Sequence, residues 1–471
     1  MNATERVVKF ICETGGAAIA PEAREFGRRA LLDTIGVALA GVDEPAARLA
    51  RRIVEADGGQ AQAAVIGTSM RAPLGAAALA NGTAGHALDY DDVTSSVNGH
   101  PSIPLVPAVL AVGEAEGASG ADVVTAFVVG FEVEGKIGRA LGRSHYLRGF
   151  HQTTTVGALG AAAAAARLMR LTAEETANAL GIAASMSGGM QANFGSMTKP
   201  LQAGNAARGG VVAAQLAREG FTGGTDILDG PFGFIGLFAP DSDGDAELID
   251  GFGDPWEVLD PGIAVKKYPC CFVSHRPADA ALTLAERHSL TPELVERVVV
   301  HVPEGAISPT GNIGPLIHSR PQTGLEGKFS LEYVVAAALF DGELRFANFD
   351  DAAVQRPELQ AFLSRVTAQG EEAPRTDDDA LGGAYNTIEV HTTDGRVLTE
   401  TLEEPRGGPA APLDWDELLA KYRDCATRVL DADSTAQTAE MIVSMDELAD
   451  VRALTAALST AATSVASGTP A

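Results

Sequence analysis

The sequence from Gly85 to Ser102 reads Gly-His-Ala-Leu-Asp-Tyr-Asp-Asp-Val-Thr-Ser-Ser-Val-Asn-Gly-His-Pro-Ser and joins a small-residue run to an apolar run. Four titratable side chains fall within twelve residues of this stretch: Asp89, Asp91, Asp92 and His100. Pro101 follows His100, and proline is favoured at the first position of a helix because its missing N–H would lack a partner there anyway. The pattern predicts that His100 lies at the start of a helix over 102–116, where free N–H groups and the helix dipole attract anions. A loop of solvated carboxylates is the alternative for this segment alone.

Three other segments repeat this arrangement of a basic or imidazole side chain just before a predicted helix. His151 precedes a helix over 153–168, and Lys199 precedes one over 201–219. A third segment leads to a helix over 277–288 and carries Lys266, Lys267, Cys271 and His275. Four such helix starts, with lysine supplying full charge, predict a shared site for an anionic ligand. The alternative is coincidence, because the chain has 24 prolines and proline marks helix starts anywhere.

These side chains indicate proton-transfer chemistry on a carboxylate. A carbon acid next to a carboxylate needs a base with a near-neutral pKa, and His100 and His151 are the candidates, flanked by Asp89 and Lys199. Lysines and helix starts can stabilise the developing enolate-like charge without a metal ion. One histidine would act as the base and the other as the acid, and the sequence leaves open which is which. His86, on a helix face, is expected either to serve packing or to support the residues that contact the substrate.

The composition limits the class of protein. A chain of 471 residues exceeds what one hydrophobic core usually serves, so two domains are expected. The formal charge of −27 argues against nucleic-acid binding, which needs a basic footprint. Aromatic residues make up only 5% while alanine and glycine abound, which predicts helices packed closely through small residues.

No segment predicts a membrane span, a metal site or a resident cofactor. The alanine-rich stretch 156–166 is too short to cross a bilayer, and the N-terminus lacks the apolar core of a signal peptide. The four cysteines lack the spacing of zinc or iron–sulfur ligands, and we find no nucleotide-binding loop. We therefore expect a cytoplasmic enzyme that works on a small anion with no metal and no cofactor.

The spacing of apolar residues predicts a mainly α protein with an inserted α+β unit. Helices are expected over 24–39, 45–55, 73–88, 103–116, 120–141, 153–168, 173–187 and 201–219, and again over 413–430. Residues 295–302 predict a strand, and Asp394-Gly395 predicts a hairpin between 387–392 and 397–402. We expect a helical domain of 1–264 plus 406–458, a smaller α+β lid domain of 265–405 with helices over 277–288 and 331–340, and a disordered tail over 459–471.

Several motifs occur together and in order along the chain. They are His86-Ala-Leu-Asp89-Tyr-Asp-Asp92, Gly99-His100-Pro-Ser, Gly149-Phe-His151, Met197-Thr-Lys199-Pro-Leu-Gln-Ala-Gly-Asn-Ala-Ala-Arg208, Lys266-Lys-Tyr-Pro-Cys-Cys and Lys328-Phe-Ser. In these motifs the chain resembles the MmgE/PrpD family, which contains 2-methylcitrate dehydratases, cis-aconitate decarboxylases and iminodisuccinate epimerases. The resemblance covers residues 20 to about 405.

The resemblance implies an architecture and a site. The architecture is a helical domain with an inserted α+β lid, usually in a homodimer, and the site between the domains is free of cofactors and binds a small di- or tricarboxylate. Its active-site positions correspond here to Asp89, His100, His151, Lys199 and Lys266. We assign substrate contacts to Thr94, Arg208, Lys266, Lys267, Cys271 and His275.

Departures from the family pattern bear on the reaction. Cys271 stands where animal-type decarboxylases carry a histidine, and Ile317 stands where they carry a tyrosine, so both changes argue against decarboxylation. The loop from His145 to His151 resembles the epimerase branch, in which a tyrosine matching Tyr146 is a candidate acid/base. We expect a lyase that dehydrates a 2-methylcitrate-like hydroxy acid. The alternatives are an epimerase of a carboxylate-bearing stereocentre, a cis-aconitate decarboxylase and, with least support, a non-catalytic carboxylate-binding protein.

Overall fold

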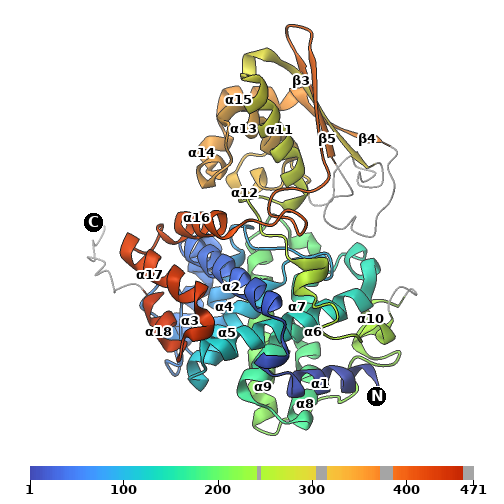
Figure 1. Ribbon diagram of the computed structural model, residues 1–471, viewed down its shortest axis with the longest axis vertical. Helices are drawn as coiled ribbons and strands as arrows, with labels where there is room; N and C mark the ends of the chain where they lie inside the picture. Colours follow the sequence, from blue (N-terminus) through green and yellow to red (C-terminus); the bar gives the residue numbers. More distant parts are fainter. Residues whose placement is uncertain (241–244, 304–315, 372–385, 460–471) are drawn as a thin grey trace.

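The computed structural model describes residues 1–240, 245–303, 316–371 and 386–459, and most of their regular structure is helical. Figure 1 shows a large helical body and, above it, a smaller part that contains a sheet. The predicted mainly α class is therefore confirmed. The predicted tail lies outside the described residues except for Ser459. None of the described helices is both long enough and apolar enough to cross a bilayer.

The helical body is built from chain segments that precede and follow the smaller part. Its helices are α1 (Ala3–Glu13), α2 (Pro21–Gly41), α3 (Pro45–Asp57), α4 (Leu74–His86), α5 (Ser102–Glu116), α6 (Gly120–Leu147), α7 (Gln152–Met169), α8 (Ala173–Met186), α9 (Thr198–Arg218), α10 (Phe234–Phe238), α16 (Trp415–Ala426), α17 (Ala432–Val443) and α18 (Arg452–Ala457). The strands β1 (Ala63–Ala64) and β2 (Arg71–Ala72) form a short antiparallel pair.

The smaller part packs helices against a four-stranded sheet of order β4-β3-β5-β6. Its strand β3 is parallel to β4 and antiparallel to β5, and β5 and β6 form the predicted hairpin. A hydrophobic cluster of its own fills this part, separate from the cluster that fills the helical body. The elements are α11 (His275–His288), β3 (Val295–Pro303), α12 (Gly324–Gly327), α13 (Leu331–Asp341), α14 (Asp351–Val354), α15 (Pro357–Phe362), β4 (Val366–Glu371), β5 (Asn386–Thr392) and β6 (Val397–Leu402).

Two differences from the predicted elements have physical reasons. Strand β4 was not predicted, because its sequence Val-Thr-Ala-Gln-Gly-Glu carries little β-branched or aromatic character, and its pairing with β3 determines its conformation. Helix α9 begins at Thr198 rather than at residue 201, since Pro200 occupies its first turn, where no N–H is needed. The earlier start places Lys199 inside that first turn.

The helices of the body approach each other through small residues, as the composition predicted. Gly204 of α9 faces α4, and a Cβ atom at this position would lie only 2.4 Å from the carbonyl oxygen of Leu79. Gly82 of α4 meets α9 in the same contact, where its Cβ would lie 2.7 Å from the Cα of Gly204. This close approach brings the end of α4 next to the start of α9.

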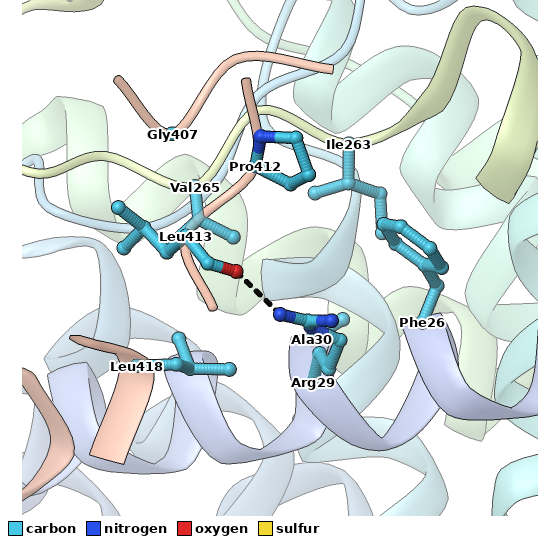
Figure 2. Close-up of a pocket in the computed structure, with 9 residues that line it drawn as sticks. All are labelled: Phe26, Arg29, Ala30, Ile263, Val265, Gly407, Pro412, Leu413 and Leu418. Atoms are coloured by element: carbon cyan, nitrogen blue, oxygen red, sulfur yellow. Dashed lines mark hydrogen bonds between the residues drawn. The ribbon is translucent and has the colours of Figure 1, made fainter. Parts of the chain in front are cut away.

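The chain passes twice between the helical body and the smaller part. The two connecting segments lie side by side and pack against α2. The Val265 amide donates to the Gly407 carbonyl at 2.8 Å. Figure 2 shows the small pocket at this junction, where the Arg29 guanidinium of α2 donates to the Leu413 carbonyl and Leu418 of α16 forms one wall. Helix α16 thus covers α2 as soon as the chain returns from the smaller part.

The contact between α4 and α9 yields a prediction about stability. Gly204→Ala should lower the free energy of unfolding by roughly 1–3 kcal/mol, because the added methyl group meets backbone atoms that cannot move aside. Gly209→Ala on the same helix is the matched control, since its Cβ would be 3.5 Å from the Met186 side chain, an ordinary contact. The control should be neutral or stabilising by up to about 1 kcal/mol through helix propensity. Urea unfolding of both variants measures the difference, and equal effects would contradict the packing described.

Candidate active site

Asp89 lies at the centre of a buried ion cluster, in the loop that follows α4. Its φ of 53° places it in the left-handed region. One carboxylate oxygen accepts a hydrogen bond from the Lys199 ammonium in the first turn of α9. The other accepts from Lys266 Nζ at 2.8 Å, and the same ammonium donates to the Asp89 carbonyl at 2.6 Å. One carboxylate therefore joins a loop, a helix start and the segment that leads into the smaller part.

The charges of this cluster stabilise one another. Burial alone would raise the pKa of Asp89, but the neighbouring Lys199 and Lys266 ammonium groups outweigh it and hold that pKa well below its usual range. Burial likewise opposes the charge of Lys266, yet the nearby Asp89 and Asp91 carboxylates raise the pKa of that ammonium. Asp89 and Lys266 are therefore both ionised at neutral pH.

Asp91 makes contact with two imidazoles. Its Oδ2 lies 2.8 Å from His86 Nδ1 and 3.2 Å from His100 Nδ1. Burial would raise the pKa of Asp91, but the two histidines lower it well below its usual value. Burial lowers the pKa of His100 to about 4, even though Asp91 acts in the opposite direction. His100 is thus a neutral imidazole at physiological pH, with Nε2 3.7 Å from an oxygen of Asp89.

His151 is held in one tautomer by Gln202. Its Nδ1 lies 2.7 Å from Gln202 Oε1, and the amide nitrogen of Gln202 donates to the Met190 carbonyl at 3.2 Å, which fixes the orientation of the amide. Nδ1 therefore carries the proton, and Nε2 has no hydrogen-bond partner among the described residues. Burial, with His86 and Lys199 nearby, holds the pKa of His151 well below its usual value, so its Nε2 lone pair is available as a base.

One cavity collects these groups, and three helix starts meet at its wall. It is lined by Asp89, Asn98, Gly99, His100, Tyr146, His151, Lys199, Lys266 and Cys271, and by the apolar side chains of Val93, Phe194, Phe272, Val273 and Phe329. His100 lies two residues before α5, His151 is the N-cap of α7 and Lys199 is in the first turn of α9. The starts of α5 and α7 are fastened together, because the His100 amide donates to Thr153 Oγ1 at 2.9 Å. Three of the four predicted helix starts therefore converge, while the start of α11 at His275 does not line the cavity.

Comparison with known proteins places this site in a family. The family model for the MmgE/PrpD N-terminal domain matches residues 5–246, and the model for the C-terminal domain matches 268–447. The chain belongs to the MmgE/PrpD family. It is 30% identical to a cis-aconitate decarboxylase of Homo sapiens, over 92% of this chain and 89% of that protein. It is 31% identical to a cis-aconitate decarboxylase of Aspergillus terreus (83% and 82% covered) and 26% identical to a 2-methylcitrate dehydratase of Cupriavidus necator (81% of each).

In this MmgE/PrpD member, the sequence drew attention to Tyr146 and Cys271. Both side chains line the cavity, and both are uncharged. Tyr146 follows a kink at Gly142 in α6, and burial together with Cys271 and Asp89 raises the pKa of its phenol. Burial, and then Asp89, raises the pKa of the Cys271 thiol to about 11, so this side chain is a thiol and not a nucleophilic thiolate. Ile317 is 49% exposed and does not line the cavity.

Four of the residues predicted to contact substrate lie away from the cavity. The Thr94 hydroxyl is used in a hydrogen bond of 2.8 Å to the Gly262 carbonyl, and Arg208 is exposed on α9. Lys267 points outward to Asp279 at 3.3 Å, since consecutive side chains of an extended segment lie on opposite sides. His275 is buried in the smaller part, with Nε2 3.4 Å from the Cys270 carbonyl. Closeness to Lys266 in the sequence therefore did not predict whether Lys267 and His275 line the cavity.

Three side chains that support the cluster were not assigned a role from the sequence. Phe194 and Phe329 each place their ring centroid 5.1 Å from the Lys199 ammonium, a cation–π distance. The Lys328 ammonium donates to the Leu88 carbonyl at 2.7 Å and to the Pro269 carbonyl at 2.9 Å. It thus connects the residue before Asp89 to the segment just after Lys266. The Lys328-Phe-Ser motif was the only signal for this support, and Phe194 lay in no motif.

The donor set of the cluster favours an anionic ligand over a metal ion. The ligand atoms of His86, Asp89 and His100 lie within 4.8 Å of one another, a spacing that could hold a cation. Both carboxylate oxygens of Asp89, however, already accept from ammonium groups, and the Nδ1 of His86 is held by Asp91. A metal ion would have to displace two lysines, whereas a carboxylate ligand would find two ammonium groups in place.

The neighbouring lysines 266 and 267 offer a matched test of this geometry. Lys266→Met should lower the free energy of unfolding at pH 7 by roughly 3–5 kcal/mol, because the buried Asp89 carboxylate loses a partner. Lys267→Met should change it by no more than about 1 kcal/mol, since it removes only a surface ion pair. Chemical denaturation of both variants measures these values. Similar losses for the two substitutions would contradict the placement of Lys266 inside and Lys267 outside.

Proposed function

We propose that the protein is a cofactor-independent lyase that dehydrates a small tricarboxylate of the 2-methylcitrate type. The observation that carries this proposal is a single buried cavity in which two ammonium groups meet one carboxylate beside two neutral imidazoles. The names of the relatives, 2-methylcitrate dehydratase and cis-aconitate decarboxylase, support a tricarboxylate as the class of substrate.

The substrate binds through its carboxylates. Lys199 uses one donor on Asp89 in the contacts found among the described residues, which leaves ammonium N–H groups for a ligand. The start of α7 adds backbone N–H groups, because the side chain of its N-cap His151 makes no capping hydrogen bond. At the start of α9 the Thr198 and Lys199 amides already donate to Ser196, so α9 contributes the Lys199 ammonium. Asp89 holds the ammonium groups of Lys199 and Lys266 in position before the substrate arrives, so no reorganisation is needed at the moment of reaction.

Two side chains share the proton transfers. Before the reaction, His151 is unprotonated at Nε2 and Tyr146 carries its proton. His151 removes the proton from the carbon next to a carboxylate, since its Nε2 carries a free lone pair. Lys199 and Lys266 stabilise the enolate-like charge that develops. Tyr146, whose raised pKa keeps its phenol protonated, donates to the leaving hydroxyl group, and water departs. After water departs, His100, the second neutral imidazole, passes the proton from His151 to the phenolate of Tyr146, which restores both groups.

The smaller part, residues 265–405, acts as a lid over the body formed by 1–264 and 406–458. Cys271, Phe272 and Phe329 support this role, since they come from the smaller part and form one wall of the cavity. They exclude water from the reacting groups. The family resemblance further suggests a homodimer, and the free cysteines of the chain suit a reducing, cytoplasmic compartment.

Decarboxylation of cis-aconitate is the second candidate. The relatives with that name support it, because they match at 30–31% identity while the dehydratase matches at 26%. The apolar wall of Phe194 and Phe329 would also favour loss of a poorly solvated carboxylate. Dehydration ranks first because the neutral thiol of Cys271 replaces a histidine of animal-type decarboxylases and because Ile317 lies outside the cavity.

Proton NMR in D₂O with a panel of 2-methylcitrate, citrate, cis-aconitate and iminodisuccinate separates these reactions. Dehydration should turn the methyl doublet of 2-methylcitrate into the singlet of a methyl group on a double bond. Vinyl signals of itaconate from cis-aconitate would instead establish the decarboxylase. Deuterium uptake at a stereocentre without net product would establish an epimerase. A panel without conversion or exchange would refute the proposal of a tricarboxylate lyase.

Replacing the proposed base should abolish turnover with the fold intact. His151→Ala should lower kcat by about 10²–10⁴-fold, the usual contribution of a positioned acid or base. His288→Ala, at the end of α11 and outside the cavity, is the control and should keep normal activity. Thermal unfolding confirms that both variants are folded. Normal turnover by His151→Ala would remove this residue from the chemistry.

A further inference from the structure

We infer that Asp91, together with His86, is a positioning pair that keeps the proton of His100 on Nδ1 and its Nε2 free for proton transfer in the cavity. This inference rests on the proposed function, because it assigns His100 a part in proton transfer. It adds a residue that does not line the cavity to the proposed reaction.

The nearest charge favours one tautomer of His100. A single oxygen of Asp91 lies 2.8 Å from His86 Nδ1, which is a hydrogen bond, and 3.2 Å from His100 Nδ1, which is an electrostatic contact without hydrogen-bond geometry. An ionised carboxylate is an acceptor only, so a neutral imidazole carries its proton on the nitrogen that lies nearer to one. For His100 this nitrogen is Nδ1, because the Asp89 carboxylate lies farther away, 3.7 Å from Nε2. His100 consequently keeps its lone pair on Nε2, toward the cavity that it lines.

His86 also packs against both imidazoles of the cavity. Its ring meets the ring of His100 edge to face, with centroids 4.5 Å apart, and lies at 23° to the ring of His151, with centroids 5.8 Å apart. Because Asp91 fixes His86 through Nδ1, the ring of His86 restricts the rotation of both neighbours. The carboxylate thus orients His100 directly and His151 through one intervening ring.

The next residue in the chain, Asp92, is in a different state. Burial, and then the nearby Asp33 carboxylate, raises the pKa of Asp92 to about 8, so it is a neutral acid at physiological pH. Its carboxyl group accepts from the Ser102 hydroxyl and from the Ser102 amide at 3.3 Å, at the start of α5. No hydrogen bond or ion pair connects Asp92 to an imidazole among the described residues. Asp91 and Asp92 are therefore a matched pair of buried carboxyl groups, of which one is charged.

Asp91→Asn should impair catalysis far more than Asp92→Asn. Both Nδ1 atoms lie against the same oxygen, so an asparagine removes the charge that holds them. The Asp89 carboxylate, 3.7 Å from His100 Nε2, then draws the proton of His100 to that nitrogen. We expect kcat to fall by about 10²–10⁴-fold and KM to change by less than about threefold. Asp92→Asn preserves both charge and shape, so its kcat should stay within about threefold of the natural protein.

The pH profile provides a readout that a purely structural role would not move. Asp91 raises the pKa of His100, and its removal should therefore shift the acidic limb of kcat/KM to lower pH. The titratable groups that face Asp91 and His100 from the surrounding elements are Asp33, His86, Asp89, Asp92, His151 and Lys266. Asp92→Asn is uncharged like the acid that it replaces, so it should leave this limb in place.

Nitrogen NMR of histidine-labelled protein tests the tautomers without substrate. The natural protein should show His86 and His100 protonated on Nδ1, and Asp91→Asn should move the proton of His100 to Nε2. Unchanged kcat and pH profile in a folded Asp91→Asn variant, or a His100 protonated on Nε2 in the natural protein, would overturn the inference. A natural protein that is inactive on the whole panel would refute the proposed function, and the NMR measurement would still decide the tautomers. If Asp91→Asn does not fold, NMR of the natural protein still decides the tautomers.

Discussion

The ion pairs between Asp89 and two lysines are the contact around which the site is organised. Buried ion pairs seldom add net stability, because removing the charges from water costs about as much as their attraction returns. This cluster therefore does not explain the stability of the fold. It explains the chemistry, since charges that are fixed and dry before the substrate binds can stabilise a developing negative charge at no further cost of reorganisation. The protein that surrounds them must supply the rigidity.

Small residues supply that rigidity in the helical body. The contact of Gly82 with Gly204 brings α4 and α9 together, so that Asp89, three residues beyond α4, meets Lys199 in the first turn of α9. The bond between His100 and Thr153 fixes the start of α5 against that of α7 in the same way. A body rich in alanine and glycine is thus a requirement of the site, because larger side chains would move the helix starts apart.

Much of this arrangement could be predicted from the sequence, for identifiable reasons. Helix starts carry local signals, and the capping box of Thr172 and Glu175 at α8 and the proline at the first position of α3 are examples. His100, His151 and Lys199 were found because each lies beside such a signal. Strand β4 was missed because its conformation comes from a distant partner and not from its own residues.

Side-chain direction was the part that local patterns could not provide. Lys266 and Lys267 are equivalent in the sequence, yet one is buried on Asp89 and the other is exposed beside Asp279. The pairing of His86 with Asp91 depends on the left-handed backbone of Asp89, which reverses the chain between them. No spacing rule for a helix or a strand predicts a contact across such a turn.

The position of α16 has a consequence for how the chain folds during synthesis. Helix α2 leaves the ribosome early, but the groups that cover it come nearly 400 residues later: Trp415 donates to Glu25, separated by 390 residues, and Lys421 pairs with the buried Asp33 at 2.6 Å. At roughly 5–20 residues per second, α2 waits on the order of 20–80 s for its cover. Through that interval Asp33 has no countercharge and an apolar helix face is open to other chains. The surface of α2 that α16 covers therefore stays exposed in the nascent chain until residues 415–426 have emerged.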